Sequence, residues 1–204
     1  MYIPEQYKNN DKDEISAFLQ KNSFGILINQ TNGLLWATHI TLELDNNEAG
    51  KPVLYGHISK ENPQSESFAS NAKILAIFSG PHSYISPSWY DHENVPTWNY
   101  VAVHIYGTLK IIEGEALLLS LKKLVDKHEA LSENPVRLED LSKKTMRQIR
   151  GIVGFEIEIE DIQGVKKMSQ TRDDQNYQNI ITELRNTKHP NAIAVAETML
   201  KCTR

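Results

Sequence analysis

The sequence predicts a mainly β fold with flanking helices, in the β or α+β class, rather than a parallel α/β sheet. Segments with strand-like alternation dominate the chain before about residue 112, and helical segments dominate after it, around one strong strand. Few helices separate the five or six expected strands. This arrangement indicates an antiparallel barrel.

The first two strands are expected to form a hairpin. Residues 24–28 are a short apolar run, and Asn32-Gly33 follows, a dipeptide typical of a tight turn because both positions tolerate positive φ. Residues 34–44 then alternate with period two. Thr38 and His39 therefore point to opposite faces, and only one of them can face a given ligand.

Four more segments predict strands. Residues 53–58 and 74–79 are apolar runs, the second closed by Gly80-Pro81. Residues 99–112 are long enough to need a bend, which we expect at Gly107. Residues 153–160 alternate apolar residues with glutamates, as a half-buried strand does.

Cap residues and helical spacing predict the helices. Asn62 before Pro63 is a cap followed by a first-turn proline, and it predicts a short helix to about Ser70. Polar loops are expected at 45–51 and 132–135. The remaining helices are expected at 115–130, at 138–149, from Asp173 or Asp174 to Arg185, and from about Pro190 onward.

Length and composition are those of one globular domain. We expect a single domain over residues 1–204, with a helical C-terminal extension from about 173 to 204. The 22 basic and 26 acidic side chains give a net charge of −4, which argues against a broadly basic nucleic-acid surface. Cys202 is the single cysteine, and the N-terminus lacks the features of a secretory signal. A cytoplasmic location is the expectation.

Several kinds of chemistry lose support from the sequence. No pair of the seven histidines has the spacing of a metalloprotease helix, and no carboxylate or cysteine cluster completes a zinc set, so no metal site is expected. Glycine-rich dinucleotide and phosphate loops and a nucleophile elbow are also missing from the sequence. No residue is evidently placed as a general acid or base, and the sequence favours a protein that is not an enzyme.

A dense aromatic and hydroxyl segment stands out at residues 82–90 and 95–100. It holds two of the three tryptophans and three of the eight tyrosines. Such residues suit a flat heteroaromatic ligand, because rings offer stacking faces and hydroxyls bind polar edges. A rigid aromatic loop packed at a subunit interface explains the same composition equally well.

Seven ordered blocks of residues extend along nearly the whole chain: 1–4, 37–40, 56–63, 84–90, 95–100, 152–157 and 167–170. Together they resemble the PaiB-type FMN-binding negative transcriptional regulators, a family with a flavin split barrel. Thr41 and Thr171 depart from the family's pattern, standing where proline and asparagine are expected, and Thr171 lies near a possible ligand contact.

The resemblance implies an FMN cofactor and a set of residues that hold it. Lys60 lies between a strand and a capped helix, which suits a phosphate; otherwise it is an ordinary solvated lysine. His57 either donates to the ligand or is a satisfied core histidine, and Trp98 either contacts the flavin ring or packs in the core. The set is Thr38, His39, His57, Lys60, Asn62, Trp98, Lys167, Ser169 and Gln170.

Partners follow from the same resemblance. Flavin sites in this fold usually lie between protomers, so a homodimer is implied. Lys167, Ser169 and Gln170, on a polar tip after a strand ending near Glu160, either reach the flavin of a partner chain or form a surface loop.

The sequence supports DNA binding weakly. The candidate phosphate contacts Lys143, Lys144, Arg147 and Arg150 follow the acidic pair Glu139 and Asp140, and no helix-turn-helix is evident. The regulatory role is therefore implied by the family. An FMN-dependent oxidoreductase and a haem-handling protein on the same barrel are the alternatives.

Overall fold

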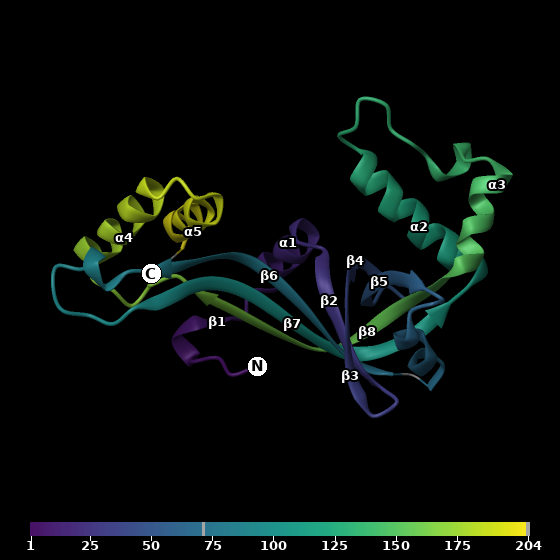
Figure 1. Cartoon of the computed structure of the whole chain (residues 1–204), viewed down its shortest axis with the longest axis horizontal. Coiled ribbons are helices and arrows are strands. Elements are labelled where there is room, and N and C mark those ends of the chain that lie inside the picture. The colour runs from purple at the N-terminus through teal and green to yellow at the C-terminus, as the bar shows by residue number, and fades with distance from the viewer. Residues whose placement is uncertain (71, 203–204) are drawn as a thin grey trace. The chain divides into compact units, whose positions relative to one another are not determined.

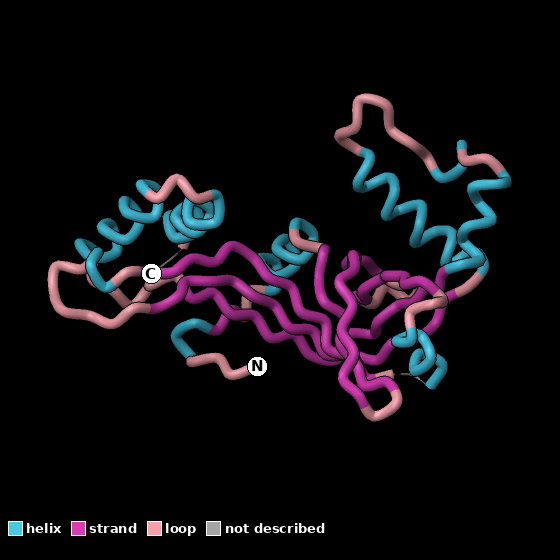
Figure 2. The backbone as a smooth tube through the Cα atoms, in the orientation of Figure 1, coloured by secondary structure: helices cyan, strands magenta, loops and turns pink. Residues whose placement is uncertain are grey.

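The computed structural model of the chain describes residues 1–70 and 72–202 (Figure 1). Contacts divide the chain into two compact units. The terminal unit comprises Met1–Phe18, Phe78–His104 and Gln163–Arg204, and the central unit comprises Leu19–Ile77 and Ile105–Ile162. In both units helices flank the strands (Figure 2), so the expected class of a β-rich, α+β fold is confirmed. The single domain over residues 1–204 stays a prediction.

Eight strands form the sheet, in the order β3-β2-β6-β7-β8-β5-β4, with β1 also paired to β8. Every pair with an assigned register is antiparallel. Antiparallel neighbours agree with the scarcity of crossover helices in the sequence. The strands are β1 (Lys8–Asn9), β2 (Phe24–Thr31), β3 (Leu34–Thr41), β4 (Glu43–Asn46), β5 (Pro52–Ser59), β6 (Lys73–Ile85), β7 (Thr97–Ile112) and β8 (Ile152–Lys167).

The turn between β2 and β3 is the one that the sequence predicts. Asn32 and Gly33 have φ of 53° and 79°, which is the left-handed region that a two-residue hairpin turn requires. The register runs from Thr31 opposite Leu34 to Phe24 opposite Thr41. Because β3 pairs only with β2, it is an edge of the sheet.

Two strand ends differ from the sequence prediction. β6 does not close at Gly80-Pro81 but runs on to Ile85. A Cβ at Gly80 would meet Phe18 and Val101, so the glycine allows close packing inside the strand rather than ending it. β8 likewise continues past Glu160 to Lys167, where Val165 pairs with Lys8 of β1.

Gly107 lies within β7 for a reason of packing. A Cβ at this position would fall on the backbone carbonyl oxygen of Glu158 and on Ile157 of β8. The close approach of the two strands therefore requires glycine here.

Most of the expected helices are present. The 3-10 helix Pro63–Ser70 follows its Asn62 cap, and the side chain of Asp173 caps α4. The single helix expected at 138–149 is wrong, because extended backbone at Leu141 and Ser142 separates the 3-10 helix Leu138–Asp140 from a helical stretch made of Lys143–Met146 and the 3-10 helix Arg147–Gly151. The α-helices are α1 (Lys12–Lys21), which the sequence analysis missed, α2 (Gly114–Glu129), α3 (Lys143–Met146), α4 (Asp174–Asn186) and α5 (Pro190–Leu200).

Each unit has its own core. In the terminal unit α4 and α5 pack against each other, burying Ile180, Leu184 and Val195 with no exposed surface (Figure 1). The Tyr177 hydroxyl donates to the Met199 carbonyl there, at 2.6 Å. In the central unit the ring of Phe68 meets Phe155 edge to face at 5.3 Å between centroids.

Candidate functional site

The turn that follows β5 is organised by Asn62. Its Oδ1 accepts from the backbone N–H of Gln64 at 3.0 Å, and its Nδ2 donates to the Thr38 hydroxyl at 2.9 Å. Asn62 therefore caps the 3-10 helix and ties the turn to β3 at the same time. Two of the residues expected at the site, Thr38 and Asn62, are brought into direct contact.

Lys60 lies at the start of this turn with its side chain exposed. Its backbone N–H donates to the Gly151 carbonyl at 2.9 Å, and its carbonyl accepts from the Ser65 hydroxyl. The backbone of the lysine is therefore fixed, while its ammonium forms no ion pair with any described carboxylate. An exposed cation on a fixed backbone, beside a helix N-terminus, is a suitable group to bind an anion.

Gln64 anchors the turn from below, and the sequence analysis missed it. The side chain is fully buried, and its Nε2 donates to the Leu27 carbonyl at 3.1 Å and to Asn29 Oδ1 at 2.8 Å. Its Oε1 is buried with no partner among the described residues. No local pattern marks Gln64, because the partners of its side chain, Leu27, Asn29 and Trp36, lie at least 28 residues away in the sequence.

The two histidines of the central unit differ in environment. His39 is exposed on β3, and its ring stacks beside Phe24 at 6.4 Å between centroids. His57 is half-buried on β5, and burial lowers its pKa below the ordinary value. His57 is therefore neutral at physiological pH, with one ring nitrogen able to donate and the other able to accept.

Trp98 belongs to an exposed aromatic group in the terminal unit. Its side chain is 53% exposed, which contradicts the alternative that it packs in the core. The rings of His82 and Tyr84 lie 6.3 Å and 6.1 Å from it, between centroids. This aromatic group offers ring faces to a partner or a ligand.

Lys167, Ser169 and Gln170 are held by contacts inside the terminal unit. The Lys167 ammonium donates to the Thr97 hydroxyl at 2.5 Å, and the buried Ser169 hydroxyl donates to Asn99 Oδ1 at 3.0 Å. Both ends of the Gln170 amide are engaged with backbone groups. The polar tip expected after a strand end near Glu160 is instead the end of β8 and the turn that follows it.

The nine candidates divide between the two units, and their roles stay predictions. Five lie in the central unit and four in the terminal unit. Among the described residues, no group of three or more histidine, cysteine, aspartate or glutamate side chains is arranged to hold a metal. In the same part of the chain, no helix is long and apolar enough to cross a bilayer.

Comparison with known proteins assigns the chain to a family. Residues 1–161 match the family described as "Putative FMN-binding domain". The chain is 42% identical over 200 residues to "Protease synthase and sporulation protein PAI 2" of Bacillus subtilis (strain 168), covering 98% of this chain and 96% of that protein.

Two solved structures share the fold at low sequence identity. The flavocytochrome Anf3 from Azotobacter vinelandii superposes with a TM-score of 0.63 at 16% identity, over 87% of this chain and 78% of that one. The FAD and heme binding protein from Mycobacterium smegmatis gives 0.62 at 15% identity, over 79% and 73%. The expected fold, that of the flavin split barrels, is confirmed.

Proposed function

We propose, from the premise that this chain belongs to the PaiB-type FMN-binding family, that it binds FMN and represses transcription in the cytoplasm. The cofactor follows from the family, which is named for it. The regulatory role and the compartment are the parts that need an experiment. The observation that supports the proposal best is the fixed turn after β5, with its exposed lysine.

The side chains at this turn fit the polar end of FMN. The Lys60 ammonium would hold the phosphate, and the Ser65 hydroxyl and the 3-10 helix N-terminus lie on the same turn. The Oε1 of the buried Gln64 has no donor among the described residues, and a ribityl hydroxyl, rather than the phosphate, is the part of FMN that could donate to it.

The other candidates would serve the remainder of the cofactor. Either Thr38 or His39, which point to opposite faces of β3, would hydrogen-bond to its polar edges together with His57 and Asn62, and Trp98 would offer a ring face. Lys167, Ser169 and Gln170 would act from a partner chain only by exchanging the hydrogen bonds that hold them in the terminal unit. When bound, FMN supplies a redox-active isoalloxazine ring; the protein's residues bind it, orient it and shield it from water.

A homodimer is part of the proposal, and the edge strand β3 supports it. Its sequence, Leu34–Thr41, has no charged residue and no proline to block pairing with another strand. Around the hairpin, Phe24, Leu34 and Leu35 are 67%, 67% and 82% exposed. Apolar side chains at an open sheet edge are typical of surfaces that a second copy covers.

Contact with DNA would run through an exposed basic segment. Lys143, Lys144, Arg147 and Arg150 are all exposed. Because α3 has only four residues, it is too short to act as a recognition helix, so these charges would contact phosphates rather than read bases.

An FMN-dependent oxidoreductase is the second candidate. The exposure of Trp98 and Tyr84 favours it, because open ring faces leave room for a second substrate near a flavin. The FAD and heme binding protein from Mycobacterium smegmatis has a similar fold, which makes haem the third possibility to test.

Absorption spectra separate these functions. Purified chain titrated with FMN should show a saturable flavin spectrum, and the complex should oxidise NADH or NADPH no faster than free FMN. In a gel-shift assay the complex should retard DNA fragments, and replacing Lys143, Lys144, Arg147 and Arg150 by alanine should abolish the retardation.

Each contrary outcome has a defined meaning. A Soret band instead of a flavin spectrum would assign the chain to haem. Turnover well above the free-flavin background, lost in Trp98→Ala, would make it an oxidoreductase. Light scattering that gives a monomer of 23.2 kDa at micromolar concentration would remove the dimer.

A further inference from the structure

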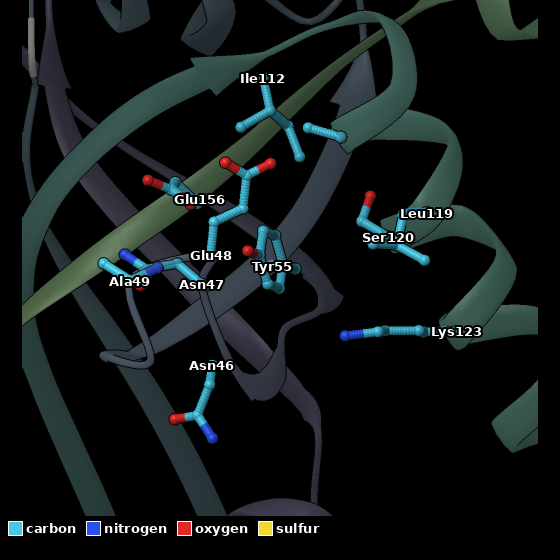
Figure 3. A pocket seen from close by; sticks show the side chains of 11 residues that line it. Asn46, Asn47, Glu48, Ala49, Tyr55, Ile112, Leu119, Ser120, Lys123 and Glu156 are labelled. Atoms are coloured by element: carbon cyan, nitrogen blue, oxygen red, sulfur yellow. Dashed lines mark hydrogen bonds between the residues drawn. The ribbon is translucent and has the colours of Figure 1, made fainter.

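The central unit contains a cleft that none of the nine flavin candidates lines. It lies between the β4–β5 hairpin, α2, the end of β7 and β8, and has a volume of about 520 Å³. Figure 3 shows Glu48, Tyr55 and Glu156 gathered on one side and Leu119, Ser120 and Lys123 of α2 on the other. Clefts of roughly 300–1,000 Å³ are the usual size for small-molecule sites.

The charged groups of the cleft are unbalanced. Glu48 and Glu156 both line it, and Lys123 is the one cation among its lining residues. The Lys123 ammonium is already paired with Asp45 at 2.5 Å. Lys110 is near enough to interact with Glu156, but its ammonium is paired with Glu158. The cleft therefore has more carboxylates than free cations.

The environment of Tyr55 reflects the same excess of carboxylates over free cations. Its Cα pairs across the sheet with both Glu43 and Glu156. Burial, and then the carboxylates of Glu156, Asp45 and Glu48, raise the pKa of the Tyr55 hydroxyl. The phenol therefore stays protonated, and its ring adds a face on which a cation can rest.

The opposite wall is apolar. Ile112 of β7 and Leu119 of α2 line the cleft, and Leu119 is 54% exposed. An exposed leucine beside carboxylates suits a ligand with a cationic end and a hydrocarbon body, because each part then meets its own kind of surface.

We propose that this cleft is a binding site for a small organic ammonium ion, whose charged nitrogen lies between Glu48 and Glu156 and whose hydrocarbon part lies against Leu119 and Ile112. None of the flavin candidates lines the cleft, although His57 lies two residues from Tyr55 on β5, and the proposal does not depend on the proposed function. The protein would then have a second small-molecule binding site, at α2, in addition to its FMN site.

Binding is measured on the full-length chain with n-hexylammonium chloride, followed by chemical shifts of the labelled protein. The expected result is saturable binding at millimolar or lower concentration, with shifts centred on Tyr55 and Ser120. Hexanoate and 1-hexanol, which lack the positive charge, should bind at least about tenfold more weakly. Equal binding of hexanoate, or no saturation with hexylammonium by 20 mM, would overturn the proposal.

Variants locate the site. Glu48→Gln and Glu156→Gln should each weaken hexylammonium binding about three- to tenfold, while Glu133→Gln, an exposed acid in the loop after α2, should not change it. Ala116→Trp, which places an indole at the lining of the cleft, should abolish binding. Circular dichroism confirms that each variant is folded. Loss with Glu133→Gln equal to that with Glu48→Gln would show diffuse charge attraction and disprove the site.

Discussion

The central and terminal units use similar polar residues in different ways. In the central unit, Lys60 and His39 are exposed, and the hydrogen bonds around them fix the backbone rather than their charged or ring groups. In the terminal unit, the Ser169 hydroxyl and the Gln170 amide are engaged with Asn99 and with backbone groups. A polar motif indicates a binding site only when its side chains are still available after folding.

In the terminal unit, Ser169 and Gln170 stabilise the turn between β8 and α4. Ser169 has φ of 57°, an uncommon conformation for a residue with a side chain, and its hydrogen bond to Asn99 helps to hold it. Asp173 then caps α4 through the N–H of Asn176 at 2.9 Å. The polar residues between β8 and α4 thus position the helix pair.

The largest effect should come from the helix core of the terminal unit. Leu184→Ala removes a fully buried side chain and should cost about 3 kcal/mol in the free energy of unfolding. Leu200→Ala, at a leucine of α5 that is 48% exposed, is the matched control and should cost less than about 1 kcal/mol. Urea denaturation measures both. Equal losses would show that the α4–α5 pair does not carry the stability of this unit.

The exposed side chain of Lys60 in the central unit predicts the next largest effect, a loss of FMN affinity. Lys60→Ala should weaken FMN binding by roughly 1.5–3 kcal/mol, the range for a charge-assisted hydrogen bond, and riboflavin binding much less. Fluorescence titration measures both ligands. Lys51→Ala replaces another exposed lysine of the same unit and should leave FMN affinity unchanged. If FMN and riboflavin lose equally, Lys60 does not bind the phosphate.

Ser169 gives the most direct test of the difference between available polar side chains in the central unit and engaged ones in the terminal unit. Ser169→Ala removes a buried hydrogen bond and should cost about 1 kcal/mol in the free energy of unfolding. Its effect on FMN affinity should be smaller than that of Lys60→Ala. The reverse order would assign Ser169 to the flavin, acting from the partner chain, and would make its bond to Asn99 a feature of the free state.

A smaller, pH-dependent effect is expected at His57. Burial lowers its pKa in the folded protein, so below the ordinary value of about 6.5 the unfolded chain binds the proton more readily. Stability from this residue is therefore complete above that pH and declines as the pH falls toward the folded-state pKa. Melting temperatures of His57→Gln should depend less on pH between 7.5 and 5.5 than those of the native chain.

His104 should also contribute to the pH dependence of stability. Burial, together with the N-terminal ammonium, lowers its pKa as well, so His57→Gln alone should not remove the whole dependence. A double variant with His104→Gln should flatten the profile further. An unchanged slope in His57→Gln would mean that the histidine titrates alike in both states.

Local signals predicted much of the fold. Asn32-Gly33 gave the hairpin, and Asn62, Asp173 and Pro190 marked the starts of three helices, because turn and cap preferences act within a few residues. α1 was missed although Asp11 caps it, with its Oδ1 accepting from the N–H groups of Asp13 and Glu14. Gly80-Pro81 was interpreted as a strand end, although close packing against Phe18 explains the glycine.

The site depended on contacts between distant residues. Thr38 and Asn62 are 24 positions apart and meet because the fold brings β3 to the turn after β5. The Gln64 side chain has its partners on β2 and β3. The family resemblance named the residues, but only the folded chain shows which side chains remain available.

The uncharged edge of β3 has a consequence for handling the protein. An unguarded strand can pair with any extended peptide that reaches it, including the same strand of an unfolded chain. If a variant disrupts pairing at this edge, the exposed strand should therefore make the chain more prone to precipitate at high protein concentration. The substitution Leu35→Lys would place a charge on the exposed hairpin. It is the simplest way to block strand pairing when the isolated chain is prepared in solution.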